Sequence, residues 1–139
     1  KKVYKGDGIL GKGFFKRGCL ADLWLLNGLS TLVANPELVF ACFGETGQEE
    51  SGRYCCRIYE GGSWRSIYVD DRIPCNTFLS PIFTTSSCKY EYWPLIIQKA
   101  WAKYLGSYGH IAWCSDRNDA SLVSLRMLTG GHVKRFYIF

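Results

Sequence analysis

A short stretch near the start of the chain has the layout of an active-site helix but lacks the side chain that such a helix needs. Residues 17–26 read R-G-C-L-A-D-L-W-L-L, so a lead-in of small and polar residues turns abruptly into an apolar helix. The first turn of such a helix should present a reactive side chain, but the residue at this position is Leu23. A leucine side chain cannot be deprotonated and cannot attack a carbonyl carbon. The stretch therefore predicts either a site that has lost its reaction or an ordinary buried helix.

The thiol nearest to this position in the sequence is Cys19, which precedes Leu23 on the incoming loop. No residue close to Cys19 in the sequence looks like a base that would deprotonate it. Misplacing a reacting atom by about 1 Å is costly for catalysis, so a thiol on the loop is a poor substitute for one on the helix. We interpret Cys19 as a packed or partly exposed thiol.

Other residue types with chemical potential have simpler interpretations. We expect His110 and His132 to be surface or hydrogen-bonded histidines. Asp70 and Asp71 are adjacent, and neighbouring residues of a strand point to opposite faces, so their carboxylates cannot converge on one ion. We expect one of the two to cap a turn and the other to face solvent.

The composition is that of one compact folded domain. The chain has 139 residues, of which 47% are apolar and 16% aromatic, which is enough material for a core. No apolar run reaches the roughly 20 residues that a membrane-spanning helix needs. The net charge of +5 comes from scattered basic residues rather than from a dense basic stripe. These features predict a solvated, slightly basic surface and argue against nucleic-acid binding and a transmembrane segment.

The seven cysteines give no sign of a disulfide framework or a zinc site. Their number is odd, and they form no C-x-x-C pair and no Cys/His cluster with zinc spacing. Secreted disulfide scaffolds are shorter and denser in cysteine. We therefore expect reduced thiols in an intracellular protein, several of them acting as small core residues.

The apolar periodicity predicts three helices. The first covers residues 21–34, with Asp22 as the cap of its first turn, and Asn35-Pro36 begins a short helix after it. The second covers residues 93–105, with Pro94 in its first turn and Gly106 after its end, and the third covers residues 119–128. We expect four tryptophans to lie in the core, namely Trp64, Trp93, Trp101 and Trp113.

Between the first two long helices the sequence predicts a β-hairpin. Residues 53–60 and 64–69 read as strands, and Gly61-Gly62 is a hairpin turn signal. Residues 45–52 and 73–89 have no sustained period and are predicted to be loops. The last residues, 132–139, are predicted to be either a strand or a link to a further segment.

Four motifs in this order resemble the first subdomain of the calpain protease core. Residues 17–26 are similar to the family's Q-G-x-L-G-D-C-W-L-L, and residues 64–74 (W-R-S-I-Y-V-D-D-R-I-P) are similar to W-x-x-V-x-V-D-D-x-x-P. Residues 91–108 match the pattern E-F-W-x-x-L-x-E-K-A-Y-A-K-x-x-G-S-Y, and L-T-G-G at residues 128–131 fits the motif that closes the subdomain. A motif gains weight from its context, and four in order make a strong resemblance.

The departures from the family pattern concern the residues that carry the chemistry. By the resemblance, Leu23 stands where the family has its nucleophilic cysteine, and Arg17 stands where a glutamine donates to the oxyanion hole. The family's histidine and asparagine belong to a second subdomain that this chain does not contain, and neither His110 nor His132 matches that histidine. The sequence thus predicts no catalytic residues, but a degenerate site at Arg17, Leu23 and Trp24.

The resemblance also raises the question of calcium, which calpains bind in this subdomain. Glu91 fits the family's glutamate ligand, but the aspartate of the ligand loop falls near Phe14, which has no side-chain oxygen. Calcium takes six to eight oxygen ligands, several of them carboxylates, so Glu91 predicts a weak site at best. We interpret Glu91 as an acid in the first turn of a helix, stabilised by the helix dipole, and expect no other cofactor.

The resemblance implies an α+β chain, the N-terminal half of a papain-like cysteine protease fold with a helical subdomain and a β-hairpin. We expect residues 1–139 to form one such subdomain, cut from a longer chain, because the sequence begins at Lys1 without an initiator methionine or a signal peptide.

The function expected from these departures is that of a catalytically inactive calpain-like module in the cytoplasm with a structural or protein-binding role. Calpain-like proteins that lack the catalytic residues occur in flagellated protists, and several associate with the cytoskeleton. The resemblance therefore implies protein partners in a cytoskeletal, microtubule or flagellar axoneme assembly. Two alternatives stay open: a calcium-dependent cysteine endopeptidase acting with a second subdomain, and a calcium-responsive binding module without catalysis.

Overall fold

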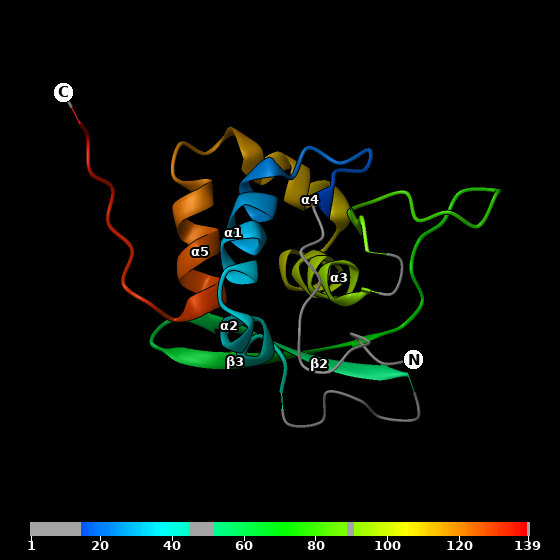
Figure 1. Ribbon diagram of the computed structural model, residues 1–139, viewed down its shortest axis with the longest axis horizontal. Helices are drawn as coiled ribbons and strands as arrows, with labels where there is room; N and C mark the ends of the chain where they lie inside the picture. Colours follow the sequence, from blue (N-terminus) through cyan, green and yellow to red (C-terminus); the bar gives the residue numbers. More distant parts are fainter. Residues whose placement is uncertain (1–14, 45–51, 89–90, 139) are drawn as a thin grey trace.

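The computed structural model describes residues 15–44, 52–88 and 91–138, and it places the helices on one face of a two-stranded sheet (Figure 1). The combination of helices with small antiparallel sheets confirms the α+β prediction. The elements, in chain order, are β1 (Phe15–Lys16), α1 (Leu23–Val33), α2 (Pro36–Ala41), β2 (Arg53–Glu60), β3 (Ser63–Asp70), β4 (Thr85–Ser86), α3 (Trp93–Leu105), α4 (Tyr108–Trp113), the 3₁₀ helix η1 (Cys114–Asp116) and α5 (Ala120–Thr129).

The β2–β3 hairpin is the longest regular pairing of the fold. The two strands are antiparallel, with Arg53 opposite Asp70 at the open end. At the closed end Gly61 and Gly62 have φ values of 59° and 88°, a left-handed backbone that a two-residue hairpin turn requires and glycine adopts at least cost. The first strand has the predicted bounds, and the second extends one residue beyond each end of the predicted range 64–69.

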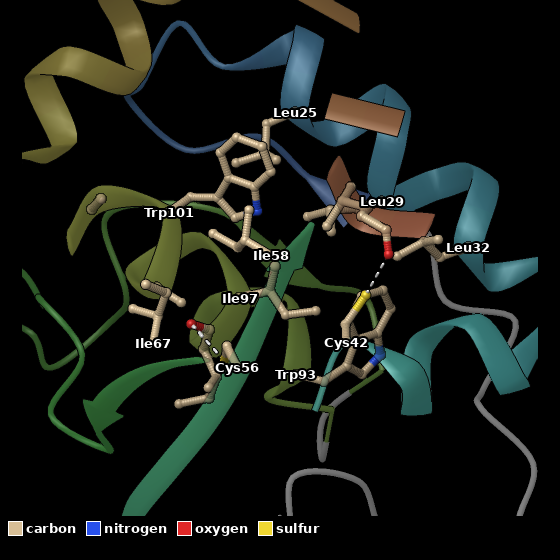
Figure 2. Close-up of a cluster of buried hydrophobic side chains, with 14 of the residues drawn as sticks. Leu25, Leu29, Leu32, Cys42, Cys56, Ile58, Ile67, Trp93, Ile97 and Trp101 are labelled. Carbon is tan, nitrogen blue, oxygen red and sulfur yellow. Dashed lines mark hydrogen bonds between the residues drawn. The ribbon is translucent and has the colours of Figure 1, made fainter. Parts of the chain in front are cut away.

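One face of the hairpin is covered by helices. Tyr54, Cys56 and Ile58 are buried on this face of β2, as the alternating pattern predicts. Figure 2 shows Ile58 and Ile67 pointing toward the side chains of α1 and α3. Trp64 lies on the other face, where its ring packs edge-on against Tyr59, and it is 36% exposed. The prediction that Trp64 is a core residue was therefore wrong.

Helices α1 and α5 pack side by side above the sheet (Figure 1). The predicted apolar periodicity of α1 is confirmed, because Leu25, Leu29 and Leu32 are fully buried against the core (Figure 2). Gly28 lets the two helices approach closely: a Cβ at this position would lie 2.7 Å from the Ser124 hydroxyl oxygen on α5. The same hydroxyl donates to the Trp24 carbonyl at 2.9 Å and so ties α5 to the first turn of α1.

Helix α3 packs against α4 and the β2–β3 hairpin and has the predicted bounds. Pro94 occupies its first turn, and Gly106 ends it with a φ of 104°. Its buried side includes Trp93, Ile97 and Trp101, each at most 2% exposed (Figure 2). These two tryptophans are core residues, as predicted.

The segment between β3 and α3 is mostly loop, as predicted, but it follows a defined path. The Asn76 side-chain oxygen accepts hydrogen bonds from the N–H groups of Phe78 at 2.9 Å and Ser80 at 3.0 Å. Farther along, β4 pairs with β1 in a short antiparallel sheet that the sequence did not predict. These contacts bring the loop back beside the residues that lead into α1.

The C-terminal third contains a helix that the sequence did not predict. Helix α4 begins after Ser107, whose hydroxyl oxygen accepts from the His110 N–H at 3.2 Å. Only its Ile111 is buried, and Trp113 is 76% exposed, so the core prediction for Trp113 was wrong as well. Helix α5 is shifted by one residue from its predicted range. The chain after it, up to residue 138, forms no strand.

The remaining predicted helix is the short one that follows Asn35. The short helix after Asn35 is confirmed as α2, and the Asn35 side-chain oxygen accepts from the Glu37 N–H at 3.2 Å. Among the helices that the structure describes, none has both the length and the apolar character to cross a bilayer.

Candidate functional site

The first turn of α1 is at the surface. Leu23 is the first residue of α1, which starts two residues after the predicted start at residue 21, and its side chain is 55% exposed. The Asp22 carbonyl oxygen accepts the N–H groups of Leu25 at 2.9 Å and Leu26 at 3.1 Å, so the helical hydrogen bonds begin immediately behind Leu23. The position is therefore accessible to a ligand, but its side chain offers only an apolar contact.

The loop before α1 is held by backbone contacts to the returning loop. The Cys19 N–H donates to the Ile82 carbonyl at 3.0 Å. Gly18 approaches the same carbonyl so closely that a Cβ would lie 2.3 Å from the oxygen. Only a glycine fits this approach without a backbone shift. The loop thereby keeps Cys19 exposed and off the helix, as predicted.

Asp22 does not cap α1 with its side chain, so the predicted cap was wrong. The residue is fully buried, and its Oδ2 accepts hydrogen bonds from the Thr84 hydroxyl at 3.1 Å and from the Gln98 side-chain amide. Among the described residues its Oδ1 has no hydrogen-bond partner. Burial raises the pKa of the Asp22 carboxyl; the two hydrogen bonds and the charge of Arg17 oppose that rise but do not cancel it. The carboxyl therefore joins the start of α1 to α3 rather than facing a ligand.

The remaining residues of the predicted degenerate site point in different directions. Arg17 is exposed on the loop, close enough for its charge to act on Asp22. Trp24 is buried, its Nε1–H donates to the Ile111 carbonyl at 2.9 Å, and its ring packs edge-on against Trp101 at 5.5 Å. Trp24 thus fixes α1 against α3 and α4, while Arg17 and Leu23 face solvent.

Of the two histidines and the paired aspartates, His110 and Asp70 have structural partners. His110 Nδ1 lies 3.0 Å from the Ser107 hydroxyl at the start of α4, and His132 is exposed on the chain after α5. Asp70 accepts from the Arg72 N–H at 2.8 Å and forms an ion pair with Lys99, which confirms its role in a turn. The hydrogen bond from Lys99 is the main cause that lowers the pKa of the Asp70 carboxyl.

Glu91 was predicted to be an acid in the first turn of a helix, and this was wrong. It lies before α3 rather than within it, it is 9% exposed, and its carboxylate accepts from the Ser86 hydroxyl at 2.7 Å. The hydroxyl in turn accepts from the Cys88 N–H at 3.1 Å, so Glu91 anchors the end of β4. The equivalent of the calcium loop, near Phe14, lies outside the described residues.

The described residues do not fit a calcium ion. Nowhere in residues 15–44, 52–88 and 91–138 do three or more His, Cys, Asp or Glu side chains gather closely enough to hold a metal. Calcium prefers several carboxylates, and Glu91 contributes one that already has a hydroxyl donor.

Three of the cysteines, Cys42, Cys55 and Cys56, are buried, which confirms the prediction that several act as core residues. Cys42 donates its thiol hydrogen to the Leu128 carbonyl at 3.3 Å, and Cys56 donates to the Ile96 carbonyl at 3.9 Å (Figure 2). Burial raises the pKa of the Cys42 thiol to about 12 and that of Cys56 further still. Neither thiol can act as a nucleophile at neutral pH.

A cavity of about 420 Å³ that Leu23 does not line was not predicted from the sequence. Five elements meet around it: the first turn of α1, the turn of the hairpin, the end of α3, η1 and α5. We call it the aromatic pocket, and its principal lining residues are Trp24, Tyr59, Trp101, Tyr104, Arg117 and Arg126. The apolar spacing of α3 indicated that Trp101 would be buried, but nothing in the local sequence indicated which distant residues would surround it.

Comparisons with known proteins agree with the sequence motifs. The family described as "Calpain family cysteine protease" matches residues 10–138. Calpain-10 of Rattus norvegicus is 34% identical over 132 residues, which cover 90% of this chain and 19% of that protein. The Calpain-type cysteine protease ADL1 of Oryza sativa subsp. japonica is 36% identical over 92 residues, covering 66% of this chain and 4% of that protein.

A third relative gives the same result over a similar region. The Calpain-2 catalytic subunit of Gallus gallus is 32% identical over 95 residues, covering 66% of this chain and 13% of that protein. The chain therefore spans 19% or less of the length of these three relatives. The matches confirm the resemblance seen in the motifs and, with it, the N-terminal half of a papain-like cysteine protease fold.

Proposed function

The chain belongs to the calpain family of cysteine proteases, and within that family we propose that it is a catalytically inactive member with a structural or protein-binding role. The observation that carries the proposal is Leu23, which occupies the exposed first position of α1. A cysteine protease needs a thiolate that attacks the scissile carbonyl, and the start of a helix favours that thiolate. An aliphatic side chain leaves a surface that can bind a peptide chain but cannot cleave it.

The surroundings of Leu23 support the same proposal. The exposed Cys19 thiol lies on a loop whose backbone is pinned to Ile82, so this thiol cannot move onto the helix without breaking that contact. Arg17, which stands in the place of the family's oxyanion-hole glutamine, is exposed and carries a longer, charged side chain. Asp22 directs its carboxylate into the core. None of the three supplies an attacking group at the start of α1.

We further propose protein partners in the cytoplasm, within a cytoskeletal or flagellar assembly. The support is the likeness to calpain-like proteins that lack the catalytic residues and associate with the cytoskeleton. Co-sedimentation of the purified full-length protein with stabilised microtubules tests this part. We expect the protein in the pellet with microtubules and in the supernatant without them; equal amounts in the supernatant in both cases would refute a direct microtubule partner.

The loss of catalysis is tested with fluorescent casein and the full-length protein, with and without calcium. We expect no release of fragments above the buffer control under either condition. Hydrolysis that stops when an alkylating reagent blocks thiols would refute the proposal, because it would require a cysteine nucleophile elsewhere.

A second experiment asks whether the start of α1 still favours a thiolate. In Leu23→Cys the new thiol lies at the N-terminus of an 11-residue helix, and we expect its pKa to fall by about one unit or more below 8.5. The matched control is Ala21→Cys, an exposed position just before the helix. Alkylation rates measured against pH by mass spectrometry should show the lower pKa at residue 23 alone. Equal pKa values in both variants would show that this helix start gives no activation.

Membership of a protease family favours one second candidate: a calcium-dependent cysteine endopeptidase acting with a second subdomain, in which Cys19 is the nucleophile. It predicts casein hydrolysis that disappears in Cys19→Ser and persists in the matched control Cys75→Ser, another exposed thiol. Calorimetric titration of the full-length protein separates it from a calcium-responsive binding module, which would bind the ion without hydrolysing casein.

A further inference from the structure

The aromatic pocket has the size and walls of a ligand site. Its volume of about 420 Å³ falls within the range of roughly 300 to 1,000 Å³ that small-molecule sites occupy. Leu23 and the loop before it do not line the pocket, whereas Trp24, the next residue of α1, forms part of its wall. Binding there requires no reactive side chain at residue 23.

The inner walls are held in place without a ligand. Trp24 and Trp101 pack edge-on with ring centroids 5.5 Å apart, and Trp101 packs in the same way against Tyr104 at 6.1 Å. The indole of Trp24 is fixed by its hydrogen bond to the Ile111 carbonyl, and the hydroxyl of Tyr104 donates to Glu60. A ligand would therefore order few side chains when it binds, which lowers the entropic cost of binding.

Most of the charged side chains on the lining that could pair with a ligand are positive. Glu60 lines the pocket, but its carboxylate is already engaged by the Tyr104 hydroxyl and by an ion pair with Arg65 at 3.1 Å. Arg117 and Arg126 are exposed at the lining and form no ion pair within the part of the chain that the structure describes. Asp119 is the other acid on the lining, so two cations face one anion there.

We propose that the aromatic pocket binds an aromatic carboxylate. The flat ring would lie against Trp24, Trp101 and Tyr104, where offset or edge-on aromatic packing adds to the burial of apolar area. The carboxylate would meet Arg117 and Arg126, whose planar guanidinium groups donate two parallel hydrogen bonds to a carboxylate. This inference does not depend on the proposed loss of catalysis.

The test is a titration of the purified full-length protein with 1-naphthoate, followed by tryptophan fluorescence and calorimetry. We expect saturable binding with a Kd on the order of 1 mM or tighter, given the size of the ligand. The uncharged 1-naphthalenemethanol, which has the same ring, should bind at least about tenfold more weakly. Arg117→Gln and Arg126→Gln should each weaken binding of naphthoate several-fold and leave binding of the alcohol unchanged. Lys134→Gln, an exposed basic residue outside the pocket, should change neither.

Val123→Trp provides the steric test. Val123 is 39% exposed on α5 and lines the pocket, so a large side chain there fills the space with little effect on the core. This variant should lose binding of both naphthalene ligands while its circular dichroism stays that of the wild type. Three results would overturn the proposal: no saturation at about 10 mM naphthoate, equal affinity for the acid and the alcohol, or tighter binding of 1-naphthylmethylamine than of naphthoate. Binding that survives in all three pocket variants would also overturn it, since it would belong to another surface.

Discussion

The start of α1 and the aromatic pocket distribute their polar groups in opposite ways. At the start of α1 the polar side chain, Asp22, is fully buried and the exposed one, Leu23, is apolar. In the pocket the apolar rings of Trp24 and Trp101 are buried and the charged groups, such as Arg126, are exposed. A ligand arriving from solvent therefore meets hydrocarbon at the first site and charge at the second.

Under the proposed loss of catalysis, the backbone at the start of α1 has been kept while the reactive side chain has not. The loop before α1 keeps an accurate fit, since Gly18 packs directly on the Ile82 carbonyl. This backbone contact positions residue 23 at the start of α1, whatever side chain residue 23 carries. The pocket depends instead on side chains from five elements, so its binding properties are set by residue types rather than by one backbone contact.

The largest effect is expected from Gly18→Ala. The added Cβ would lie 2.3 Å from the Ile82 carbonyl oxygen, so the two loops must separate, and we expect a loss of about 3 kcal/mol in the free energy of unfolding. Urea denaturation measures it. Gly109→Ala is the matched control, because a Cβ on this α4 residue would lie 3.6 Å from the Ser107 hydroxyl oxygen, an ordinary van der Waals contact. We expect that variant to be as stable as wild type or more so, by about 0.5 to 1 kcal/mol. Equal stabilities of the two variants would show that the backbone contact at Gly18 does not hold the loop.

A smaller effect is expected from the buried carboxyl beneath the helix start. In Asp22→Ala the donors on Thr84 and Gln98 lose their acceptor, and we expect a loss of about 2 kcal/mol. The pKa of Asp22 is raised in the folded protein, so the folded state binds the proton more tightly than the unfolded state. The stability that this group contributes is therefore complete below its ordinary value of 3.8 and declines as pH rises through the raised pKa.

Asp22→Asn isolates this pH dependence. The difference in unfolding free energy between wild type and Asp22→Asn should fall as pH rises above 3.8, when both are measured by thermal or urea denaturation. Asp70→Asn is the control of opposite sign. The pKa of Asp70 is lowered by Lys99, so its contribution is present above the ordinary value and declines as pH falls through the lowered pKa. Parallel difference curves for the two variants would contradict these assignments.

The smallest effect is expected at Leu23 itself. Its side chain is 55% exposed at the N-terminus of α1, so Leu23→Glu should stabilise the protein by about 0.5 kcal/mol through the helix dipole. Leu23→Lys should have the opposite sign and a similar size, and high salt should reduce both effects. A loss of more than about 2 kcal/mol in either variant would mean that Leu23 is a packing residue.

The elements that the sequence predicted well are those with local signals at both ends. Pro94 and Gly106 bracket α3, and Gly61-Gly62 marks the hairpin turn, so these elements have the predicted positions. Helix α4 was missed because it has only six residues, of which Ile111 alone is buried. A stretch with one buried residue has no apolar period to detect.

The predictions for single side chains failed where the partner is distant in the sequence. Asp22 was predicted to be a helix cap from its neighbours in the sequence. Its actual hydrogen-bond donors, Thr84 and Gln98, lie 62 and 76 residues away, so the local pattern could not indicate them. The position of Cys19 on the loop before the helix was predicted correctly, since it depends on the helix boundary, which is local. The aromatic pocket escaped prediction because Trp24, Tyr59 and Arg117 meet only in the folded chain.

The placement of the cysteines also determines how the protein will respond to oxidants. Peroxides and disulfides react with thiolates rather than with protonated thiols. Cys42 and Cys56 are held protonated in the interior, so they are protected for as long as the domain stays folded. Cys19 and Cys75 are exposed, so in air-exposed solution the first covalent change will be on the outside of the molecule, where two copies can become linked while the interior stays intact.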